Sequence, residues 1–342
     1  MTDQQTLDEL AQALAGTGVD VRRDFSLAPM TTYGVGGRAS VAVVITDIDS
    51  CADIAGVLAR CDDVPVAVVG RGSNTLVADD GFHGVALIIS AAPRTTELSL
   101  TDGAVVAPAS MTMPVLARRS VGLSRGGLEW CVGIPGSVGG AVRMNAGGHG
   151  AEMVDSLVSA RVLSLRTAQV CDVKTEDLGL HFRGSALSAH HLVVSACMST
   201  SSIEISEGEK LIDEIVKWRR DHQPGGRNAG SVFVNPAPGD GSAGALIDSL
   251  GLRGYTVGGA SVSSKHANFI QADQNATASD VVTVMSHVQS EVERASGIRL
   301  RSEVCLLGFS DEVSIRFADP IHSHPDRIDA RQKVCALLGE DR

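Results

Sequence analysis

The stretch from Gly127 to Gly150, GLEWCVGIPGSVGGAVRMNAGGHG, constrains the fold more than any other part of this chain. Seven glycines follow Gly127 in it, and glycine loses more backbone entropy on folding than any other residue. A fold keeps glycine at this density where φ must be positive or where another body approaches the main chain. From composition alone, the stretch could be a flexible surface loop. A flexible linker, however, would lack the larger apolar residues found among these glycines, namely Ile134, Val138, Val142 and Met144. We therefore expect a packed segment whose backbone lies against something large.

Two local signals lie inside this glycine-rich stretch. Pro135 followed by Gly136 predicts a turn. Ser137 belongs to the residue types that cap helices, so a short helix is expected to follow it. The first N–H groups of that helix would then face an anion.

The length and charge of the chain limit its class of function. A chain of 342 residues suggests two or three domains with a sizeable core. The net charge is −11, from 29 basic and 40 acidic side chains. This balance argues against nucleic acid or an anionic membrane as the main partner. A small anionic molecule stays possible, because a few local arginines suffice to bind it.

Cysteine usage and the N-terminus indicate the compartment. The seven cysteines are odd in number and widely spaced, without a C-x-x-C pair, so they form neither a disulfide framework nor a zinc motif. The first 16 residues are acidic and amphipathic, unlike a signal peptide. No run reaches the roughly 18 apolar residues of a membrane helix. We expect a soluble cytoplasmic protein with no membrane insertion and no obligate protein partner.

Hydrophobic periodicity predicts a mixture of helices and strands. The predicted helices cover residues 6–16, 49–61, 112–121, 211–220, 243–250 and 277–296. The predicted strands cover residues 41–45, 64–69, 157–165, 168–173, 192–197 and 298–308, with a strand entry at 265–271. Residues 96–108 are expected to form an antiparallel hairpin around Asp102 and Gly103. A change of composition at 199–209 indicates a domain boundary.

Two further glycine clusters invite a nucleotide-binding interpretation. In TTYGVGGRA, at 31–39, the spacing does not fit the dinucleotide fingerprint and no apolar strand precedes it. In contrast, the strand at 64–69 runs directly into GRGSN at 70–74. Such a turn can present several backbone N–H groups and a serine hydroxyl to a phosphate. Arg71 could add charge or face solvent, and the alternative is a plain strand–turn connection.

The C-terminal part contains one charged residue in an apolar run and a charged tail. Glu303 lies in the middle of the predicted strand at 298–308, where it either faces water or is kept for chemistry. The tail from Phe309 onward looks peripheral. Its His322, His324 and Asp326 could in principle bind a metal, but a solvated tail without a metal site is the preferred interpretation.

Six segments in sequence order resemble the UDP-N-acetylenolpyruvoylglucosamine reductase family, flavoenzymes of peptidoglycan precursor synthesis in cell wall biogenesis. They are GRGSNTLVADDGF at 70–82, GIPGSVGGAVRMNAGGHG at 133–150, HFRGSA at 181–186, NAGSVFVNP at 228–236, SKHANFI at 264–270 and SEVCLLG at 302–308. Single motifs of this kind are weak, but six in order are specific. The resemblance covers about residues 20–309.

The resemblance implies an α+β fold. Its first part is an FAD-binding domain of the vanillyl-alcohol-oxidase (PCMH) type in two lobes, and its second is a smaller C-terminal α/β substrate domain. On this chain the implied division is an N-terminal helix at 1–19, the FAD-binding domain at 20–200, the substrate-binding domain at 201–309 and a peripheral tail at 310–342. The two lobes would cover about 20–92 and 93–200.

The resemblance also implies where FAD binds. Backbone groups would contact the phosphates and the isoalloxazine, which explains glycine where side chains would block a close approach. FAD is expected to be bound non-covalently, because no His or Cys is placed to form a covalent link. The residues implied are Gly70, Arg71, Gly72, Ser73, Asn74, Thr75, Ile134, Pro135, Gly136, Ser137, Gly140, Asn145 and Ala146.

The reaction implied is the reduction of UDP-N-acetylglucosamine enolpyruvate to UDP-N-acetylmuramate, with NADPH as hydride donor to FAD. A hydride reaches C3 of the enolpyruvyl group and a proton is added at C2. By resemblance, Arg183 holds and polarises the substrate carboxylate, Glu303 assists it, and Ser231 donates the proton. Rival interpretations are an oxidase on the same flavin fold, or a flavin- or UDP-sugar-binding protein without turnover.

Two positions depart from the usual family pattern. Phe182 stands where many members have tyrosine, and Val234 stands where many have a lysine that helps to bind the nucleotide phosphates. The phosphates must therefore be held by other groups in this chain. The expected substrate contacts are Asn235, His266 and Asn268, with candidate cations and donors at Arg219, His222 and Arg227.

Overall fold

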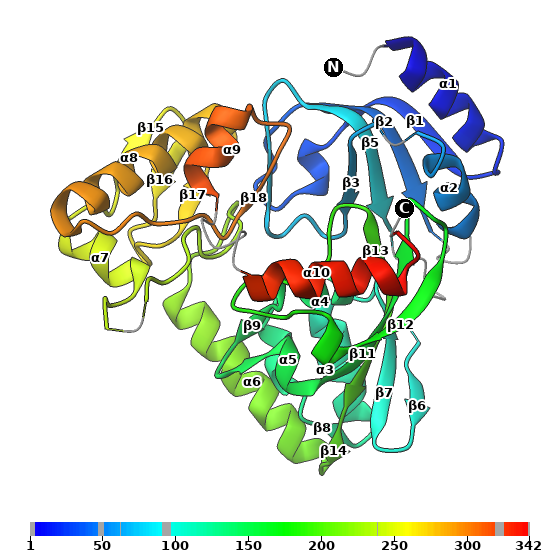
Figure 1. Cartoon of the computed structure of the whole chain (residues 1–342). Helices are drawn as coiled ribbons and strands as arrows, with labels where there is room; N and C mark the ends of the chain where they lie inside the picture. The colour runs from blue at the N-terminus through cyan, green and yellow to red at the C-terminus, as the bar shows by residue number, and fades with distance from the viewer. Residues whose placement is uncertain are drawn as a thin grey trace.

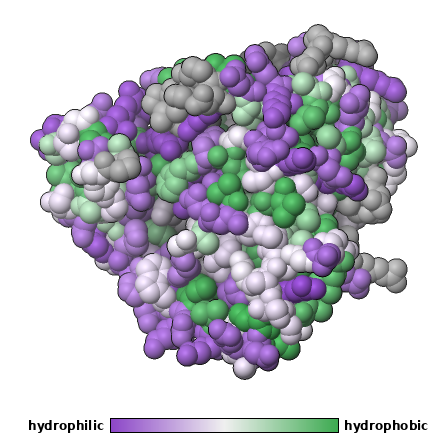
Figure 2. Space-filling model, turned by 60° about the horizontal axis from the view of Figure 1, so that its bottom comes forward, coloured by the Kyte–Doolittle hydropathy of each residue, from purple (hydrophilic) through white to green (hydrophobic). Residues whose placement is uncertain are grey.

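The computed structural model describes residues 4–46, 51–61, 63–90, 97–237, 239–318 and 325–340. It shows an α+β protein with three groups of elements: an N-terminal lobe, a second lobe built on a larger sheet, and a C-terminal region (Figure 1). None of the helices in the described ranges combines the length and apolar content that crossing a membrane requires. On the face shown in Figure 2, hydrophobic residues lie in small groups among hydrophilic ones.

The N-terminal lobe is a four-stranded sheet with two helices packed against it. Its order is β1-β2-β5-β3, with β1 antiparallel to β2 and the other neighbours parallel. The apolar face of α1 packs with α2 over this sheet, as its periodicity predicts. The bounds are α1 (Gln4–Ala15), β1 (Asp20–Ser26), β2 (Arg38–Ile45), α2 (Cys51–Leu58), β3 (Val66–Val69) and β5 (Phe82–Ile89).

The second lobe is a five-stranded antiparallel sheet of order β12-β11-β13-β7-β6. The predicted hairpin is confirmed, because β6 and β7 meet at a turn in which Gly103 has φ of 70°. The bounds are β6 (Ser99–Thr101), β7 (Ala104–Pro108), α3 (Met113–Gly122), η4 (Glu129–Gly133), α4 (Val138–Met144), β9 (Gly147–Gly148), β10 (Ala151–Glu152), α5 (Met153–Ser156), β11 (Leu157–Ser164), β12 (Val170–Lys174) and β13 (His191–Ser199).

The C-terminal region packs helices against a small antiparallel sheet, β15-β16-β17. Its longest helix, α8, begins at a capping box of Thr277 and Asp280 and ends at Gly297, which takes a left-handed conformation. The bounds are α7 (Ala243–Ser249), β15 (Thr256–Val257), β16 (Ala260–Val262), β17 (Ile270–Ala272), α8 (Ala278–Ser296) and α9 (Asp311–Phe317). The helix that precedes this region in the chain is α6 (Ile205–His222).

The strand predicted over 298–308 is wrong in extent. Only β18 (Cys305–Leu307) is a strand, paired in parallel with β4 (Thr75–Val77) of the N-terminal lobe. The residues before it pair with a different segment, since Glu303 N–H donates to Val232 O at 2.7 Å. Because the chain changes partner at this point, the ladder is broken and Glu303 lies just before the strand.

The helix predicted at 211–220 is longer than expected. α6 already begins at Ile205, inside the composition change that suggested a domain boundary. It packs on the second lobe: Ile212 belongs to that lobe's core, and a Cβ on Gly208 would lie 2.7 Å from Val121. The predicted domain limit at residue 200 stays a prediction. The helix after it, α6, packs on the second lobe, which precedes it in the chain.

The tail is not peripheral where the structure describes it. α10 (Pro325–Leu337) lies along the second lobe near β12 (Figure 1). Val334 and Leu338 are fully buried in the core of that lobe. The charged residues of α10 hid this apolar contact in the sequence. His322 and His324 lie outside the described residues, and Asp326 lies in the first turn of α10.

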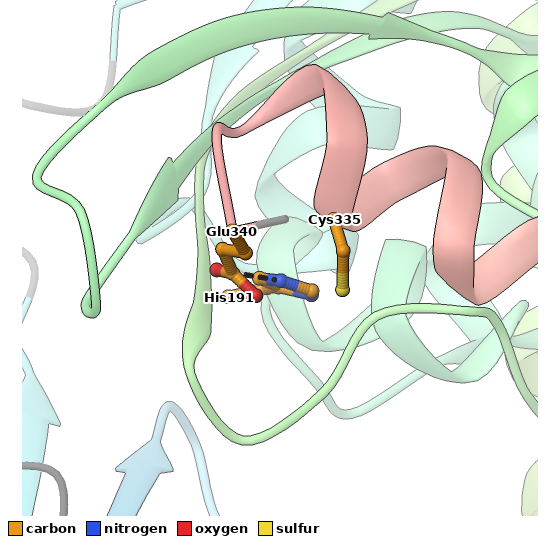
Figure 3. A group of neighbouring side chains, drawn as sticks. All are labelled: His191, Cys335 and Glu340. Carbon is orange, nitrogen blue, oxygen red and sulfur yellow. Dashed lines mark hydrogen bonds and ion pairs between the residues drawn. The ribbon is translucent and has the colours of Figure 1, made fainter. Parts of the chain in front are cut away.

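A buried polar cluster anchors the end of this tail to the second lobe (Figure 3). Glu340 accepts hydrogen bonds from Ser164 Oγ at 2.5 Å and from His191 Nε2 at 3.2 Å. Burial lowers the pKa of His191. Burial alone would raise the pKa of Glu340, but the Ser164 hydroxyl and the His191 ring outweigh it and lower this pKa overall. The cluster therefore favours an ionised glutamate beside a neutral histidine.

We predict that Glu340→Ala lowers the free energy of unfolding at pH 7 by about 1–3 kcal/mol, the usual cost of leaving a buried donor without its acceptor. Because the pKa of Glu340 is lowered in the fold, its contribution is complete above the ordinary glutamate pKa. The contribution is lost as pH falls through the lowered value, so the difference from wild type should narrow in acid. Urea unfolding from pH 7 downward measures this, with the exposed Glu312→Ala as control. Equal stability of Glu340→Ala and wild type at pH 7 would contradict the anchor.

Candidate active site

The two predicted glycine-rich segments lie side by side. A Cβ added to Gly70 would lie 2.6 Å from the Oγ of Ser137. One added to Gly136 would lie 3.2 Å from the Oγ of Ser73. The loop after β3 and the turn before α4 thus form one continuous surface, as the cofactor interpretation requires.

The loop at 70–75 has the form of a phosphate cradle. Gly72 has φ of +55°, and a Cβ there would lie 2.0 Å from Met30 O, so glycine is required. In the described parts of the chain, the backbone N–H groups of residues 71–74 donate to no protein acceptor. Arg71 is exposed beside them. Unpaired N–H groups in a tight turn suit an anionic ligand such as the diphosphate of FAD.

The end of this loop has a second role inside the protein. Asn74 Nδ2 donates to Glu303 O at 2.8 Å, and Asn74 O accepts from Cys305 N at 2.9 Å. Thr75 pairs with Cys305 in the short parallel sheet. Asn74 and Thr75 therefore hold the loop at 70–75, the candidate cofactor loop, against the segment that carries Glu303.

The expectation that the first N–H groups of α4 face an anion is wrong. Ser137 does cap the helix, since its Oγ accepts from Gly140 N at 3.4 Å. However, Val138 N–H donates to Met111 O at 2.8 Å and Gly139 N–H donates to Ala109 O at 3.0 Å. These donors join α4 to the segment before α3, and neither is available to a ligand.

Gly140 remains unexplained by protein packing. It is exposed, and a Cβ there would meet only Ser137 Oγ at 3.4 Å. Glycine inside a helix costs about 1 kcal/mol relative to alanine. Gly139 differs, because a Cβ there would lie 2.9 Å from Ala109. The open face at Gly140 is what close approach by a large ligand such as FAD would need.

The other cofactor candidates differ in their surroundings. Ile134 and Ala146 are half-buried against the core of the second lobe, and Pro135 is exposed. Asn145 ends α4 at φ of 41°, and its side chain is fully used. Its Oδ1 accepts from Val154 N at 2.9 Å, and its Nδ2 donates to Glu152 and to His181 O.

The structure brings Arg183 and Glu303 together. Arg183 lies at the tip of the turn between His181 and Gly184, with φ of +59°. Its Nε donates to Glu303 Oε1 at 2.7 Å, and its side chain and that of Glu303 are each 18% exposed. The ring of Phe182 lies 4.5 Å from the guanidinium carbon and covers it. With phenylalanine at position 182, where many family members have tyrosine, the group that covers Arg183 is an apolar ring without a hydroxyl.

Arg183 has two further acceptors in the second lobe. Its NH1 donates to Glu152 Oε1 at 3.1 Å and its NH2 to Gly147 O at 3.3 Å. Glu152 did not emerge from the sequence, where a lone glutamate after the glycine-rich stretch gave no signal. Arg183 and Glu303 border a cavity of about 280 Å³ that Arg143 and Arg301 also line.

The environment of Glu303 favours its neutral form. Burial raises the pKa of this carboxyl, and the nearby charge of Glu152 acts in the same direction. Arg183 and Arg301 lower the pKa, but burial prevails. Glu303 is therefore suited to hold a proton in a site that binds a carboxylate.

Ser231 opens into a different cavity, of about 330 Å³. Asn235, His266 and Asn268 line it as well. The side chain of Asn268 is used in the fold, because it pairs with both backbone groups of Phe233. The link from Ser231 to Glu303 is through backbone, since the next residue, Val232, accepts from Glu303 N. Ser231 is therefore near the Arg183 cavity without lining it.

The sequence missed two cations in the Ser231 cavity, Arg253 and Lys265. Lys265 belongs to the SKHANFI segment itself and could have been selected there. Arg253 NH1 donates to Ser264 O at 2.9 Å, and its guanidinium pairs with Asp248. Burial is the main cause that lowers the pKa of His266, followed by the charge of Arg253.

The three predicted phosphate candidates do not line this cavity. Arg219 donates to Gly133 O and to Gln223, and so ties α6 to the glycine-rich stretch. His222 stacks on Trp218 at 4.5 Å. Arg227 lies against Gly34 and donates to Asp273 O at 3.4 Å.

One cluster in the described ranges has metal-ligand chemistry: His191, Cys335 and Glu340 (Figure 3). The Nδ1 of His191 accepts a hydrogen bond from Ser188 N at 3.0 Å. The neutral ring must therefore carry its proton on Nε2, which points at Glu340. The His191 ring therefore turns no lone pair toward Glu340 and Cys335, and its contact with Glu340 anchors the end of α10.

The comparisons with known proteins agree with this geometry. Residues 222–307 match the family model of the UDP-N-acetylenolpyruvoylglucosamine reductase C-terminal domain, and residues 39–174 match that of an FAD binding domain. The reductase of Synechococcus sp. (strain RCC307) is 38% identical over 295 residues, which are 85% of this chain and 95% of that protein. The reductase of Synechocystis sp. (strain ATCC 27184 / PCC 6803 / Kazusa) is 39% identical over 306 residues, covering 87% and 94%.

A solved structure is also similar over most of the chain. It is the crystal structure of UDP-N-acetylenolpyruvylglucosamine reductase from Thermus caldophilus, 32% identical with a TM-score of 0.70. The match covers 84% of this chain and 98% of that one. The predicted α+β fold, with an FAD-binding domain followed by a reductase C-terminal domain, is confirmed.

We predict that Gly140→Val lowers the flavin content of the purified protein more than it lowers helix content. The protein leaves room for a side chain at Gly140, so a loss of flavin would arise from a clash with the cofactor itself. Flavin absorbance relative to protein absorbance, with far-ultraviolet circular dichroism, measures both effects. Gly122→Val is the matched control, since a Cβ at that helix position meets nothing within 4 Å. A fully yellow Gly140→Val protein would show that α4 does not border the flavin.

Proposed function

Because the chain belongs to the UDP-N-acetylenolpyruvoylglucosamine reductase family, we propose that it reduces UDP-N-acetylglucosamine enolpyruvate to UDP-N-acetylmuramate. The observation that carries the proposal is the contact of Arg183 with Glu303 beside a cavity. Asn74, in the candidate cofactor loop at 70–75, donates a hydrogen bond to the carbonyl of the same Glu303. FAD and NADPH are the cofactors of this family, and bound FAD supplies the hydride that it receives from NADPH.

Arg183 would bind the carboxylate of the enolpyruvyl group. Each of its three nitrogens already donates one hydrogen bond. A guanidinium has five N–H groups, so one stays available on each terminal nitrogen, within the described residues. Two such donors can hold a carboxylate and stabilise the charge that develops as the hydride arrives.

Glu303 would act on the same carboxylate in its neutral form. Burial raises its pKa, which supports a protonated side chain next to the arginine. A protonated carboxyl can donate a hydrogen bond to the developing enolate, whereas an ionised one would repel it.

Ser231 would donate the proton to C2, and the UDP moiety would lie in the cavity that Ser231 borders. Arg253 and Lys265 support this placement, because they supply the positive charge that Val234 does not. The substrate would then span both cavities, which the hydrogen bond between Glu303 and Val232 brings together.

The proposal includes the remaining expectations from the sequence. The FAD-binding domain would cover residues 20–200 and the substrate domain 201–309. The enzyme would work in the cytoplasm, where NADPH and UDP-sugars are available. NADPH oxidation by the purified protein, with and without UDP-N-acetylglucosamine enolpyruvate, tests the function. NADPH consumption that this substrate does not accelerate would refute it.

We predict that Arg183→Lys lowers turnover by an amount equivalent to about 2–4 kcal/mol in the activation barrier. An ammonium cannot keep three separated acceptors and also hold a carboxylate through two parallel hydrogen bonds. Steady-state kinetics measures the loss. Arg161→Lys is the matched control, since Arg161 makes a surface pair with Asp172. Equal turnover of Arg183→Lys and wild type would place the carboxylate elsewhere.

We predict that Ser231→Ala separates the two half-reactions. Reduction of the flavin by NADPH should keep its rate, because it needs no proton from Ser231. Re-oxidation by the enolpyruvyl substrate should slow by at least about 100-fold, typical for loss of a positioned proton donor. Stopped-flow absorbance follows each half-reaction, with Ser99→Ala on the exposed strand β6 as control. Re-oxidation at the normal rate would mean that another group donates the proton.

A further inference from the structure

Arg183 lies between two carboxylates from different parts of the chain. Glu303, from the C-terminal region, accepts from Nε at 2.7 Å. Glu152, from the second lobe, accepts from NH1 at 3.1 Å. All three side chains are largely buried, with Glu152 the most exposed at 30%. The reaction assigns a role to Glu303 and none to Glu152.

The hydrogen bonds distinguish the two carboxyl groups. Glu152 accepts at both oxygens, from Arg183 at Oε1 and from Asn145 Nδ2 at Oε2, 2.9 Å away. A carboxylate that accepts from donors on both sides is stabilised in its ionised form. Glu303 accepts only at Oε1, and its Oε2 has no side-chain or backbone donor within the described residues. The free oxygen of Glu303 can therefore carry a proton.

The charge within the contact of the three side chains favours a neutral Glu303. With both glutamates ionised, Arg183, Glu152 and Glu303 together carry one net negative charge, and Arg143 and Arg301 supply further positive charge to the cavity that Glu303 lines. An ionised Glu303 would repel a substrate carboxylate held by Arg183 at short range. With Glu303 protonated, Arg183 and Glu152 balance each other.

We propose that Glu152 is the permanent counter-ion of Arg183, and that it thereby leaves Glu303 free to carry a proton when the substrate carboxylate binds. This rests on the proposed function for the identity of the carboxylate, but not for the charge pairing itself. Glu152 is a positioning residue, because it acts through Arg183 and Glu303 and lines neither cavity.

The glycine-rich stretch provides the space for this contact. A Cβ on Gly147 would lie 2.7 Å from the Cγ of Glu152, so only glycine lets the glutamate cross the β9–β10 pair. The carbonyl of Gly147 accepts from Arg183 NH2 as well. The backbone N–H of Glu152 donates to Asp155 at 2.7 Å and fixes the start of its side chain. These contacts make the position of Glu152 a built feature of the second lobe.

The groups that face Glu303 determine the direction of the test. They are Arg183 and Glu152 from the second lobe and Arg301 from its own segment. Arg143, His181 and Cys305 line the same cavity. Glu152 raises the pKa of Glu303, and both arginines lower it. Removing the charge of Glu152 would leave Glu303 as the counter-ion of Arg183, so the pKa of Glu303 should fall.

The experiment compares Glu152→Gln with wild type in the substrate-free, FAD-loaded protein. Infrared difference spectra against Glu303→Gln isolate the carboxyl of Glu303. We expect its titration midpoint to move down by about one pH unit, within the range for a nearby charge. Glu152→Asp keeps the charge and should shift the midpoint less. Glu176→Gln removes an equal charge at an exposed site and should shift nothing.

Kinetics adds a second readout. Only the protonated form of Glu303 is active in the proposal. As the pH rises, the rate of the substrate half-reaction should therefore begin to fall at a lower pH in Glu152→Gln than in wild type. Lowering the pH again should restore the rate. Flavin reduction by NADPH and flavin content should be unchanged. An unshifted titration, or equal shifts in Glu152→Gln and Glu152→Asp, would overturn the proposal.

Two further outcomes keep the proposal separate from the function. A shifted titration in a protein that does not reduce the enolpyruvyl substrate would support the counter-ion and refute the proposed function. If Glu152→Gln does not fold, the wild-type spectra still decide the matter. Glu303 must then be protonated in the wild-type complex with the substrate, and spectra that show its carboxyl ionised there would overturn the proposal.

Discussion

The guanidinium of Arg183 is the interaction on which the active-site region depends. It joins Gly147 and Glu152 of the second lobe to Glu303 of the C-terminal region. Its backbone takes φ of +59°, a conformation that costs a non-glycine residue on the order of 1–3 kcal/mol. Charge-assisted hydrogen bonds to two carboxylates offset such a cost. The turn is therefore stabilised by contacts with both parts of the chain, which ties the geometry of the site to the docking of the C-terminal region.

The glycine-rich stretch serves three different purposes within a few residues. Gly139 allows α4 to pack on Ala109, and Gly147 allows Glu152 to reach Arg183. Gly140 meets neither need and leaves the exposed face of α4 open. Composition could show only that something approaches this backbone. The structure distinguishes two kinds of glycine here. At Gly139 and Gly147 the protein itself lies close to the backbone, whereas at Gly140 the surface is open, as a bound cofactor would require.

Periodicity was sufficient for most elements, because an amphipathic face such as that of α8 depends on local spacing. The shared motifs also indicated which segments meet, and Arg183 and Glu303 do so. What failed depended on tertiary partners. The N–H groups of α4 bond to the segment before α3, and the run before β18 changes partner at Glu303. Glu152 and α10 act through tertiary contacts made by residues that are ordinary in sequence, so no pattern could reveal them.

The backbone around Glu303 connects the loop at 70–75 with the segment of Ser231. Its carbonyl accepts from Asn74 in the cofactor loop, and its N–H donates to Val232, next to Ser231. Its side chain is held by Arg183. One residue is thus fixed at three points, each belonging to a different part of the proposed reaction. A shift of Glu303 would move the carboxylate site relative to both the cofactor loop and the proton donor. The parallel pairing of β18 with β4, which fixes this segment, would therefore contribute to the proposed chemistry although neither strand carries a proposed catalytic side chain.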